Sequence, residues 1–569
     1  MSLIPISPCP IVQQWEDAHA CLLSALTSYM GTCTNLRSSS LKGLAIKAED
    51  LVPRIDRHIA SLSSVVLGQT TQTQSVLSTT RNQMASRIDA LPEEVLVEIF
   101  TQVIYNLADK KYHLQNWSME QEVRSIYQRL YSLISVCSSW RDIVLRNRGF
   151  WSLVPMLDPQ VEKATDWLQY SGQLPDDAIE RSICRSSGTG LYVAINASAR
   201  APTLLPSLTN LGSRIRALDI RIHGSHNIQG VMSNLATILV PGIISKLSIA
   251  IGSRNDPDYR FFDHRPERRE LYKQILGSLH SLRIRNMKIN LYETSFTKLV
   301  ELRLENIQIG DRSIKRLLGT ISTASNLQYL HLASLRTVDP HDPIIQPQDT
   351  INDDELSISL PNLKLVYLDG MSFHDLELIF GSIVPGNEEW VVSLASYCMN
   401  RVVLGMSSKV SVGQLALLLG GFNVNTLILY NYPHMGNWLD GPQLCQLLKA
   451  VPIIKTLKMD GWDFYQEQWE ALARPQGLTA GSNEFPCIHN LHIYGARIFH
   501  EHGIQAVVTS HNIQQLRLGG RLAERSSLQD REIVNDDDIV TWLRSNVADF
   551  QLMSLNEHRP EDGNKRRLW

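Results

Sequence analysis

Apolar and polar positions recur with a helical period at the start of the chain. Between Trp15 and Leu36 the apolar residues follow steps of three and four, which places them on one stripe of an α-helix. A second stripe follows Pro53, a residue that fits the first turn of a helix, and consists of Ile55, Ile59, Leu62 and Val66. The two stripes predict a helical hairpin that packs stripe to stripe.

This hairpin has two interpretations. Residues 15–36 either mediate self-association or form a local hairpin that rests against the next domain, and we favour the local hairpin. The stretch from Gln69 to Thr80 is rich in Ser, Thr and Gln and has few large apolar residues. It predicts a linker or a frayed helix.

Three short helices are predicted between residues 88 and 151. Pro92 fits a first helical turn, and Glu93 and Glu94 lie at the positive end of that helix's dipole. The residues with helical spacing are Val95, Leu96, Ile99, Phe100 and Val103, then Ile126, Leu130, Leu133, Ile134 and Cys137, then Trp140, Ile143 and Val144. The segment predicts a compact helical trio.

Three motifs occur in order within this trio. They are Leu91-Pro92-Glu93-Glu94-Val95-Leu96-x-Glu98-Ile99-Phe100, then Val136-Cys137-x-x-Trp140-Arg141, and then Phe150-Trp151. Together they resemble the F-box, especially that of the F-box-like proteins abundant in fungi. The heptad-like helix before the trio and residues 164–175 after it also resemble flanks seen in that group.

The resemblance implies a docking function. In the family, such a trio inserts an apolar face into the Skp-type adaptor of a cullin–RING ubiquitin ligase, which is helix-in-groove recognition with a few buried anchors. The family's pattern assigns adaptor contacts to Leu91, Pro92, Glu93, Leu96, Ile99, Phe100, Val136 and Trp140, with Glu93 near the polar rim. Phe100 and Trp140 are equally candidates for packing inside the trio.

The chain departs from the family pattern at one place. Phe100 and Val136 are 36 positions apart, whereas the family connection is shorter, so Tyr105–Glu122 resembles an insertion. This insertion is expected either to form a loop beside the docking face or to weaken docking.

A short apolar pattern recurs ten times beyond residue 200. Each copy has three large apolar residues in the order apolar-x-x-apolar-x-apolar, and the central positions are 218, 247, 282, 302, 330, 366, 427, 457, 491 and 516. Successive centres lie 20 to 36 residues apart, except for one step of 61 that is expected to contain an unread copy. Helical returns are predicted at Ile314–Ile321, Leu415–Leu419 and Leu444–Leu448.

This recurrence resembles leucine-rich repeats, in which each unit is a strand followed by a helical or irregular return. One such unit cannot bury both its strand row and its helix stripe, so the units stack into a solenoid. Asparagine at the usual turn position occurs only at sites such as Asn306. The alternative is an α/β domain of another order.

The predicted fold class is therefore α/β. An N-terminal helical hairpin and a three-helix F-box-like domain precede an irregular leucine-rich-repeat-like solenoid with parallel strands. The expected ranges are 1–87 for the N-terminal helices and linker, 88–155 for the F-box-like domain, 156–210 for a connecting segment, 211–550 for the solenoid and 551–569 for a C-terminal tail.

Three long interruptions between repeats are candidates for target binding or disorder. They are Ser253–Glu270, Thr337–Pro361 and Arg474–Pro486. We favour disorder for the second. We favour binding for the first because Tyr259, Phe261 and Phe262 would otherwise be exposed aromatic side chains.

Charge and cysteine usage narrow the partner class. The 569 residues include 54 Lys and Arg and 57 Asp and Glu, a net charge of −3, so no global field attracts nucleic acid or a membrane surface. The eight cysteines are scattered without a C-x-x-C pair, which is typical of a reducing compartment. No secretory leader or membrane span is legible, so we expect a cytoplasmic or nuclear protein.

No motif for phosphate cradles, zincin sites or hydrolase elbows occurs, so we expect neither catalytic residues nor a cofactor. Cys487, His489 and His492 form the nearest metal-like cluster, but strand alternation places His492 on the opposite face from the other two, and no metal site is predicted. The sequence favours a non-catalytic substrate-recognition adaptor of a Skp–cullin–F-box ubiquitin ligase that binds an unknown protein target. The alternative is a leucine-rich-repeat scaffold whose F-box-like segment is only structural.

Overall fold

The computed structural model describes most of the chain. The described residues are 9–38, 48–85, 88, 91–105, 119–157, 178–197, 205–222, 231, 235, 237–251, 266–287, 289, 291, 294–310, 313–338, 357–403, 406–432, 436–477, 484–523 and 530–554. They belong to two compact units, residues 1–92 and 93–569.

The first unit is helical. It contains α1 (Pro10–Ser38) and a second long helix made of α2 (Ala48–Ser61), a π-helical turn η2 (Leu62–Val66) and α3 (Leu67–Ala85). The stretch predicted as a linker or a frayed helix, Gln69–Thr80, lies within α3. It is helical, so the linker alternative is wrong. Hydroxyl groups there donate to carbonyls of the preceding turn, as Thr70 does to Val66 O at 2.7 Å, which keeps the polar side chains compatible with a helix.

Two further predictions for this unit are wrong. Pro53 does not lie in the first turn, because α2 already begins at Ala48 and Pro53 is inside the helix. The stripes do not pack on each other in the described residues: Trp15, Leu22, Ile55 and Ile59 are all exposed. An apolar stripe indicates which side chains of a helix are suited to burial, but it does not indicate which element or molecule buries them.

The second unit begins with the predicted trio. Its helices are α4 (Glu93–Tyr105), α5 (Met119–Val136) and α6 (Ser138–Arg146), followed by the 3-10 turn η4 (Arg148–Trp151). Leu96, Phe100 and Ile104 project from α4 into a core shared with α5 and α6. Of the predicted insertion, Tyr105 ends α4 and 119–122 begin α5, and residues 106–118 lie outside the described residues.

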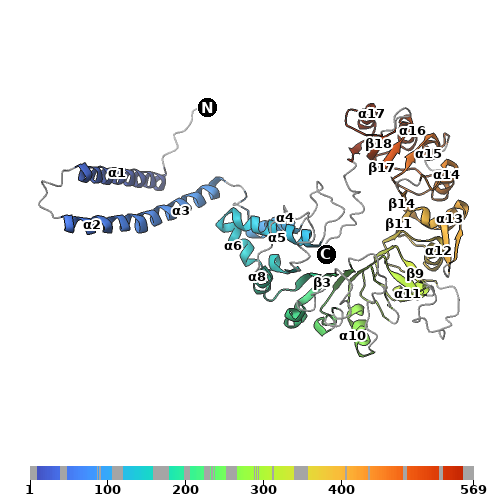
Figure 1. Cartoon of the computed structure of the whole chain (residues 1–569), viewed down its shortest axis with the longest axis horizontal. Helices are drawn as coiled ribbons and strands as arrows, with labels where there is room; N and C mark the ends of the chain where they lie inside the picture. The colour runs from blue at the N-terminus through green and yellow to red at the C-terminus, as the bar shows by residue number, and fades with distance from the viewer. Residues whose placement is uncertain are drawn as a thin grey trace. The chain divides into compact units, whose positions relative to one another are not determined.

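A large, mostly parallel sheet follows, with its strands hydrogen-bonded in chain order (Figure 1). The path runs through β1 (Leu153–Leu157), β2 (Leu191–Ala197), β3 (Ile215–Ile222), β4 (Lys246–Ile251), β5 (Ser281–Arg285), β6 (Glu301–Glu305), β8 (Tyr329–Ala333), β10 (Leu365–Asp369), β11 (Glu389–Leu394), β14 (Val424–Tyr430), β15 (Thr456–Asp460), β17 (Asn490–Ile498), β18 (Gln515–Leu522) and the antiparallel β19 (Arg531–Glu532). Strands β16 (Asp463–Phe464) and β20 (Asp549–Leu552) pair with β17 and β18, and two small sheets join β7 (Gln308–Gly310) to β9 (Arg336–Val338) and β12 (Asn400–Val403) to β13 (Met406–Lys409).

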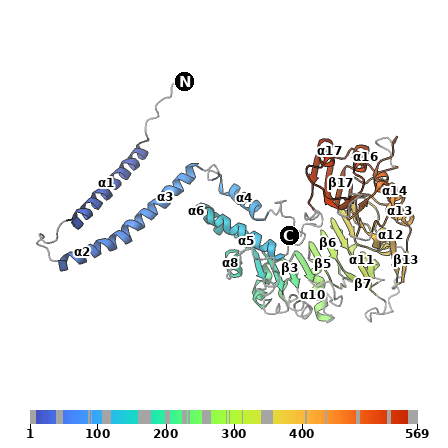
Figure 2. The same cartoon turned by 45° about the horizontal axis from the view of Figure 1, so that its top comes forward.

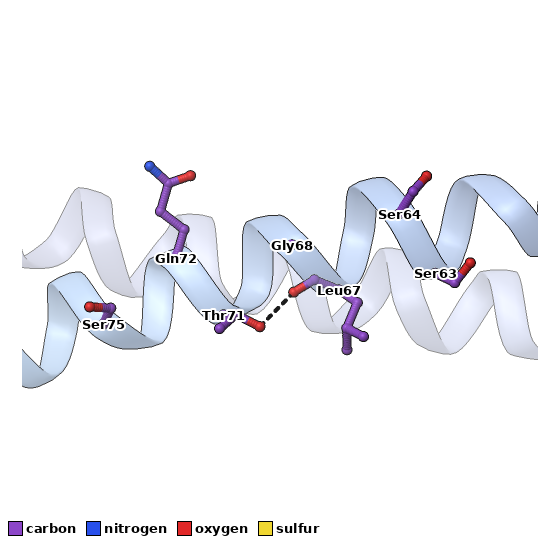
Figure 3. Close-up of a pocket in the computed structure, with 7 residues that line it drawn as sticks. All are labelled: Ser63, Ser64, Leu67, Gly68, Thr71, Gln72 and Ser75. Atoms are coloured by element: carbon purple, nitrogen blue, oxygen red, sulfur yellow. Dashed lines mark hydrogen bonds between the residues drawn. The ribbon is translucent and has the colours of Figure 1, made fainter. Parts of the chain in front are cut away.

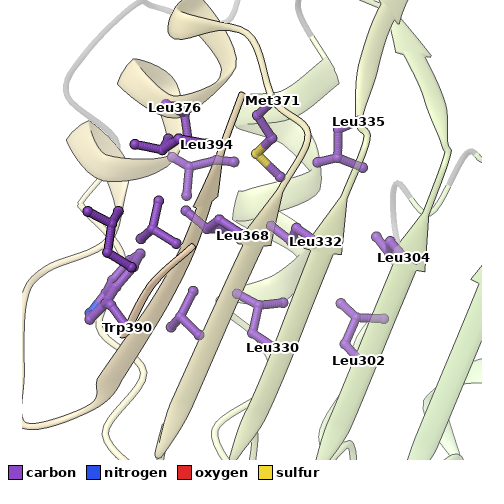
Figure 4. Packing of buried hydrophobic residues seen from close by; sticks show 14 of the residues in the cluster. Leu302, Leu304, Leu330, Leu332, Leu335, Leu368, Met371, Leu376, Trp390 and Leu394 are labelled. Atoms are coloured by element: carbon purple, nitrogen blue, oxygen red, sulfur yellow. The ribbon is translucent and has the colours of Figure 1, made fainter. Parts of the chain in front are cut away.

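The register of this sheet confirms the solenoid prediction. The central residue of each repeat lies opposite that of the next, so that Leu282, Leu302, Leu330 and Val366 form one buried row. Leu304, Leu332 and Leu368 form a second row beside it (Figure 4). The copy expected in the step of 61 residues is β11, whose side chains in the buried core are Trp390, Val392 and Leu394.

The helices between strands lie along the outer side of the curved sheet (Figure 1). They are α8 (Ala178–Arg185), the 3-10 segment η7 (Leu205–Arg214), α10 (Pro266–Gly277), α11 (Ser313–Ile321), α12 (Phe373–Ser382), the 3-10 turn η8 (Ser396–Met399), α13 (Val412–Leu419), α14 (Gly441–Ala450), α15 (Gln466–Leu472), α16 (His502–His511) and α17 (Asp538–Asn546). The predicted returns correspond to α11, α13 and α14. Capping boxes begin α12, α13 and α14 and fix where each return starts.

Left-handed turns end the central strands. Asn286, Asn306, Ser334 and Gly370 each follow a strand directly and have φ between 49° and 59°. The Asn306 backbone N–H donates to Ala333 O at 2.8 Å, and the Ser334 N–H donates to Asp369 O at 2.7 Å. Asparagine and glycine tolerate this conformation, so the stacked turns hold consecutive repeats in register.

The sheet starts earlier than the repeat pattern predicts, because β1 and β2 do not match that pattern. The trio packs against these two strands, because Leu153 and Ala194 belong to its buried core. Figure 2 shows α5 beside the beginning of the sheet. The Tyr127 hydroxyl on α5 donates to Leu153 O at 2.7 Å and also bonds the Ser182 hydroxyl of α8. The trio and the first repeats therefore form one packed body.

Candidate functional site: the outer face of the trio and the inner face of the sheet

The outward side of α4 carries a row of exposed apolar side chains. Val95, Ile99 and Val103 are spaced by four residues and are 41–44% exposed. Val136 at the end of α5 is 58% exposed. Aliphatic side chains at helical spacing on a surface indicate a contact face, because each costs free energy while it faces water.

The structure divides the predicted contact residues into two groups. Those that lie on the surface are Leu91, Pro92, Glu93, Ile99 and Val136. Leu96 and Phe100 are buried in the trio, and Trp140 is half-buried with its ring 4.7 Å from that of Phe100. These three side chains hold the helices together, and their contact role stays a prediction.

Sequence reasoning did not assign contacts to Val95 and Val103. Their signal was the four-residue step on either side of Ile99, which places them on its face rather than on that of Leu96 and Phe100. The family pattern instead assigned contacts to Leu96, Phe100 and Trp140, which hold the three helices together.

A polar border lies beside this apolar row. Glu93 forms an exposed ion pair with Arg146 at 3.7 Å, and Gln102 donates to Glu98 at 2.9 Å. Such surface pairs contribute at most about 1 kcal/mol to stability. They therefore bear on solubility and partner selection more than on folding.

The residues predicted to bind a target cannot be placed. Tyr259, Phe261 and Phe262 lie outside the described residues, as do the middle parts of the two other interruptions, 339–356 and 478–483. The inner face of the sheet is described, and its side chains come from the strand positions that alternate with the buried rows.

Charged and aromatic side chains gather on this inner face. Arg283, Arg303, His331 and Tyr367 lie side by side in register on β5, β6, β8 and β10. The rings of His331 and Tyr367 are stacked with centroids 4.3 Å apart and planes 6° apart. Two carboxylates complete the group: Glu301 binds Arg283 at 2.9 Å, and Glu305 binds Arg303 and lies 3.5 Å from Arg285.

The arginines control the protonation of their neighbours. Burial alone would raise the pKa of Glu305, but Arg303, His331 and Arg285 hold it below its ordinary value. Burial, reinforced by Arg303, lowers the pKa of His331 to about 3. At neutral pH His331 is therefore a neutral imidazole, and Glu305 is a carboxylate beside Arg285 and Arg303.

This protonation predicts a pH dependence of stability. The unfolded chain binds a proton at His331 near pH 6.5, whereas the folded chain does so only near pH 3, so stability is complete above about pH 6.5 and falls as the pH decreases toward 3. Between pH 7 and pH 5 we expect His331 to contribute a loss of about 1–2 kcal/mol. Denaturant unfolding of the wild type and His331→Gln at both pH values measures it. Equal losses in the two proteins would contradict the prediction.

Two further features are the segment Cys487–His492, which the sequence singled out, and a hollow on the first unit. The Cys487 thiol donates to His511 O at 3.7 Å and His492 bonds Gln515 and Tyr494, so these side chains have structural partners. Among the residues that the structure describes, no three His, Cys, Asp or Glu side chains are grouped to hold a metal ion, and no helix is long and apolar enough to cross a membrane. A shallow hollow on η2 and α3, near Gly68 and Thr71, is lined mainly by small uncharged residues (Figure 3).

Comparisons with known proteins add little. No protein family model matches the chain, and no curated protein matches it. One solved structure that is similar is the leucine-rich repeat-containing protein LegL7 from Legionella pneumophila, which is 10% identical with a TM-score of 0.26. The alignment covers 74% of this chain and 93% of that chain.

Proposed function

We propose that this chain is a non-catalytic substrate-recognition adaptor of a Skp–cullin–F-box ubiquitin ligase. The helical trio docks the Skp-type adaptor, which links it to the cullin, and the solenoid binds a protein target. Ubiquitin transfer then depends on proximity, with the catalytic residues on other subunits. We place this ubiquitin ligase complex in the cytoplasm or nucleus. Residues 15–36 are the segment through which the chain could self-associate.

The observation that carries this proposal is the exposed row on α4. Val95, Ile99 and Val103 form one stripe that the trio's own core does not use, which is what helix-in-groove recognition requires. The first F-box-like motif of the sequence, residues 91–100, overlaps the same helix. Neither feature identifies the partner alone, but both predict a partner for the same face.

A binding experiment with purified full-length chain and a purified Skp-type adaptor tests this proposal. Ile99→Glu places a charge in the middle of the row without entering the core, and we expect it to weaken adaptor binding at least tenfold, or about 1.4 kcal/mol. Isothermal titration calorimetry gives the affinity, and circular dichroism checks that the variant is folded.

Leu417→Glu is the matched control, because Leu417 is an exposed leucine of α13 on the solenoid, 83% exposed. It should leave adaptor binding unchanged. If the wild type forms no complex at micromolar concentration, the docking proposal is wrong and the chain is a leucine-rich-repeat scaffold with a structural trio.

A further inference from the structure

The long helices of the first unit have no core of their own. Within residues 9–38 and 48–85, no side chain that the structure describes is buried. Large apolar side chains are exposed along both helices, from Ile11 to Leu36 on α1 and from Val52 to Met84 on α2, η2 and α3. Helices in proteins obtain most of their stability from packing an apolar face, so these helices need a partner.

We propose that α1 pairs with α1 of a second copy of this chain in antiparallel orientation. This inference rests on the self-association that the proposed function includes, and it names the partner helix, its direction and its register. The dimer carries two docking faces and two sets of repeats. A target with two binding segments therefore meets the second set at a raised effective concentration once the first set has bound.

The first support is the order of large and small side chains on the apolar face of α1. The large residues recur every seven positions, and small residues follow them three positions later. The large set is Trp15, Leu22, Tyr29 and Leu36, and the small set is Ala18, Ala25 and Thr32. The Thr32 hydroxyl donates to Tyr29 O at 2.7 Å within its own helix, so Thr32 can lie in an apolar seam without losing a hydrogen bond.

This face is complementary to itself only in the antiparallel direction. A twofold axis between residues 23 and 24 brings large residues opposite small ones along the middle of the face, and each contact occurs twice. The facing pairs, each from one copy to the other, are Leu22–Ala25, Tyr29–Ala18, Trp15–Thr32 and, at the ends, Leu36–Ile11. In a parallel pair Trp15 would meet Trp15 and Ala18 would meet Ala18, which overfills one layer and leaves a void in the next.

The second long helix of the same chain offers no such seat. Its stripe consists of Ile55, Ile59, Leu62 and Val66, and none of these residues is small. The rings of Trp15 and Tyr29 therefore find space against a second α1 rather than against α2. Both rings are exposed within the single chain, Trp15 by 50% and Tyr29 by 38%.

The charges of α1 favour the same direction. Its carboxylates and its guanidinium group, on Glu16, Asp17 and Arg37, all lie off the apolar face. An antiparallel pair places the acidic first half of each helix beside the basic last turn of the other, whereas a parallel pair places like charges side by side. The two helix dipoles also oppose each other only in the antiparallel pair.

The interface is large enough for a stable dimer. A helix of 29 residues is about 43 Å long, so the two faces run beside each other over that length. Aromatic side chains such as Trp15 and Tyr29 bury roughly 150–250 Å² each when fully covered, and both copies contribute them. With Ile11, Leu22 and Leu36 of each copy, the pair reaches the roughly 1,200 Å² at which specific interfaces begin.

Sedimentation equilibrium of the purified full-length chain tests the inference. We expect a species of twice 64.2 kDa at micromolar concentration. Leu22→Glu puts a charge at the centre of the seam and should raise the dissociation constant of the dimer at least tenfold.

Leu23→Glu is the matched control. Leu23 is the adjacent residue of the same helix and is as exposed as Leu22, at 52% and 48%, but it points about 100° away from the seam. This variant should dimerise as the wild type does. Circular dichroism checks that both variants keep the same helix content.

Cross-linking with a short bismaleimide reads the direction. Its background is the full chain with the exposed Cys9, Cys21, Cys33 and Cys184 changed to serine. The double variant Ile11→Cys/Leu36→Cys should give a cross-linked dimer, whereas neither single variant should. The two positions lie about 37 Å apart along one helix, so the reagent cannot join them within a chain.

A monomeric wild type at micromolar concentration would overturn the inference, and so would equal weakening by Leu22→Glu and Leu23→Glu. A cross-linked dimer from Leu36→Cys alone would show a parallel pair and overturn the register. The Skp-type adaptor is titrated separately against each protein. Dimers that do not bind the adaptor refute only the ligase proposal, and monomers that bind it refute only the α1 pairing.

Discussion

Replacement of Trp390 by alanine is expected to lower the free energy of unfolding by about 3–5 kcal/mol. Trp390, the second residue of β11, is fully buried, and its ring centroid lies 5.0 Å from that of Phe380 and 4.9 Å from that of Phe422. Its indole Nε1 also donates to the buried Glu388 carboxylate at 3.0 Å. The substitution therefore leaves a cavity and removes a donor from a buried carboxylate.

The loss should be concentrated near β11, because repeats in a solenoid contact mainly their neighbours. Limited proteolysis with mass spectrometry locates the first cleavages, and denaturant unfolding gives the total loss. Leu417→Ala, on the exposed side of the nearby helix α13, should change stability by less than about 0.5 kcal/mol. First cleavages far from β11 would contradict this account.

Gly503→Ala is expected to destabilise the C-terminal repeats by about 3 kcal/mol. A Cβ atom at this position of α16 would lie 2.1 Å from Cγ of Trp469, a buried side chain of α15. The indole is stacked on Phe464 with centroids 4.3 Å apart, so it cannot move aside without breaking that contact.

Gly319→Ala provides the control with the opposite sign. Gly319 lies in α11, and no atom would be within 4 Å of its added Cβ, so alanine should stabilise the chain by about 0.5–1 kcal/mol through its helix propensity. Thermal unfolding of both variants measures the difference. A similar change in both would show that the close approach of α16 to α15 is wrong.

The solenoid could be predicted because its repeats have the same three apolar positions. Leu302 and Leu330 face each other in the sheet since each must bury the same side of its own strand. The copy at β11 was missed because Trp390, which pairs with the central residue Val366 of the preceding repeat, has the polar Asn387 three positions before it, where the pattern requires an apolar residue. Strand β2 was missed because its apolar residues simply alternate. Both segments are buried strands, but their apolar residues do not have the spacing of the leucine-rich repeat pattern.

The candidate sites were harder to predict. The sequence predicts a docking role for α4, which stays a prediction. It could not separate Ile99, which is exposed, from Phe100, which is buried, since that depends on where α5 and α6 pack. The inner-face cluster has no linear motif at all. Arg283, Glu305 and His331 are brought together only by the register of three strands.

The core that the trio shares with β1 and β2 stabilises the fold and also fixes the orientation of the trio relative to the first strands of the sheet. Any turning of α5 against the first strands would pull Tyr127 away from Leu153 and open the packing around Ala194. Under the proposed ligase function, a target protein held on the repeats would therefore meet an approaching ubiquitin from one direction only. Lysines on that side of the target protein would be modified, and equally reactive lysines on its far side would be spared.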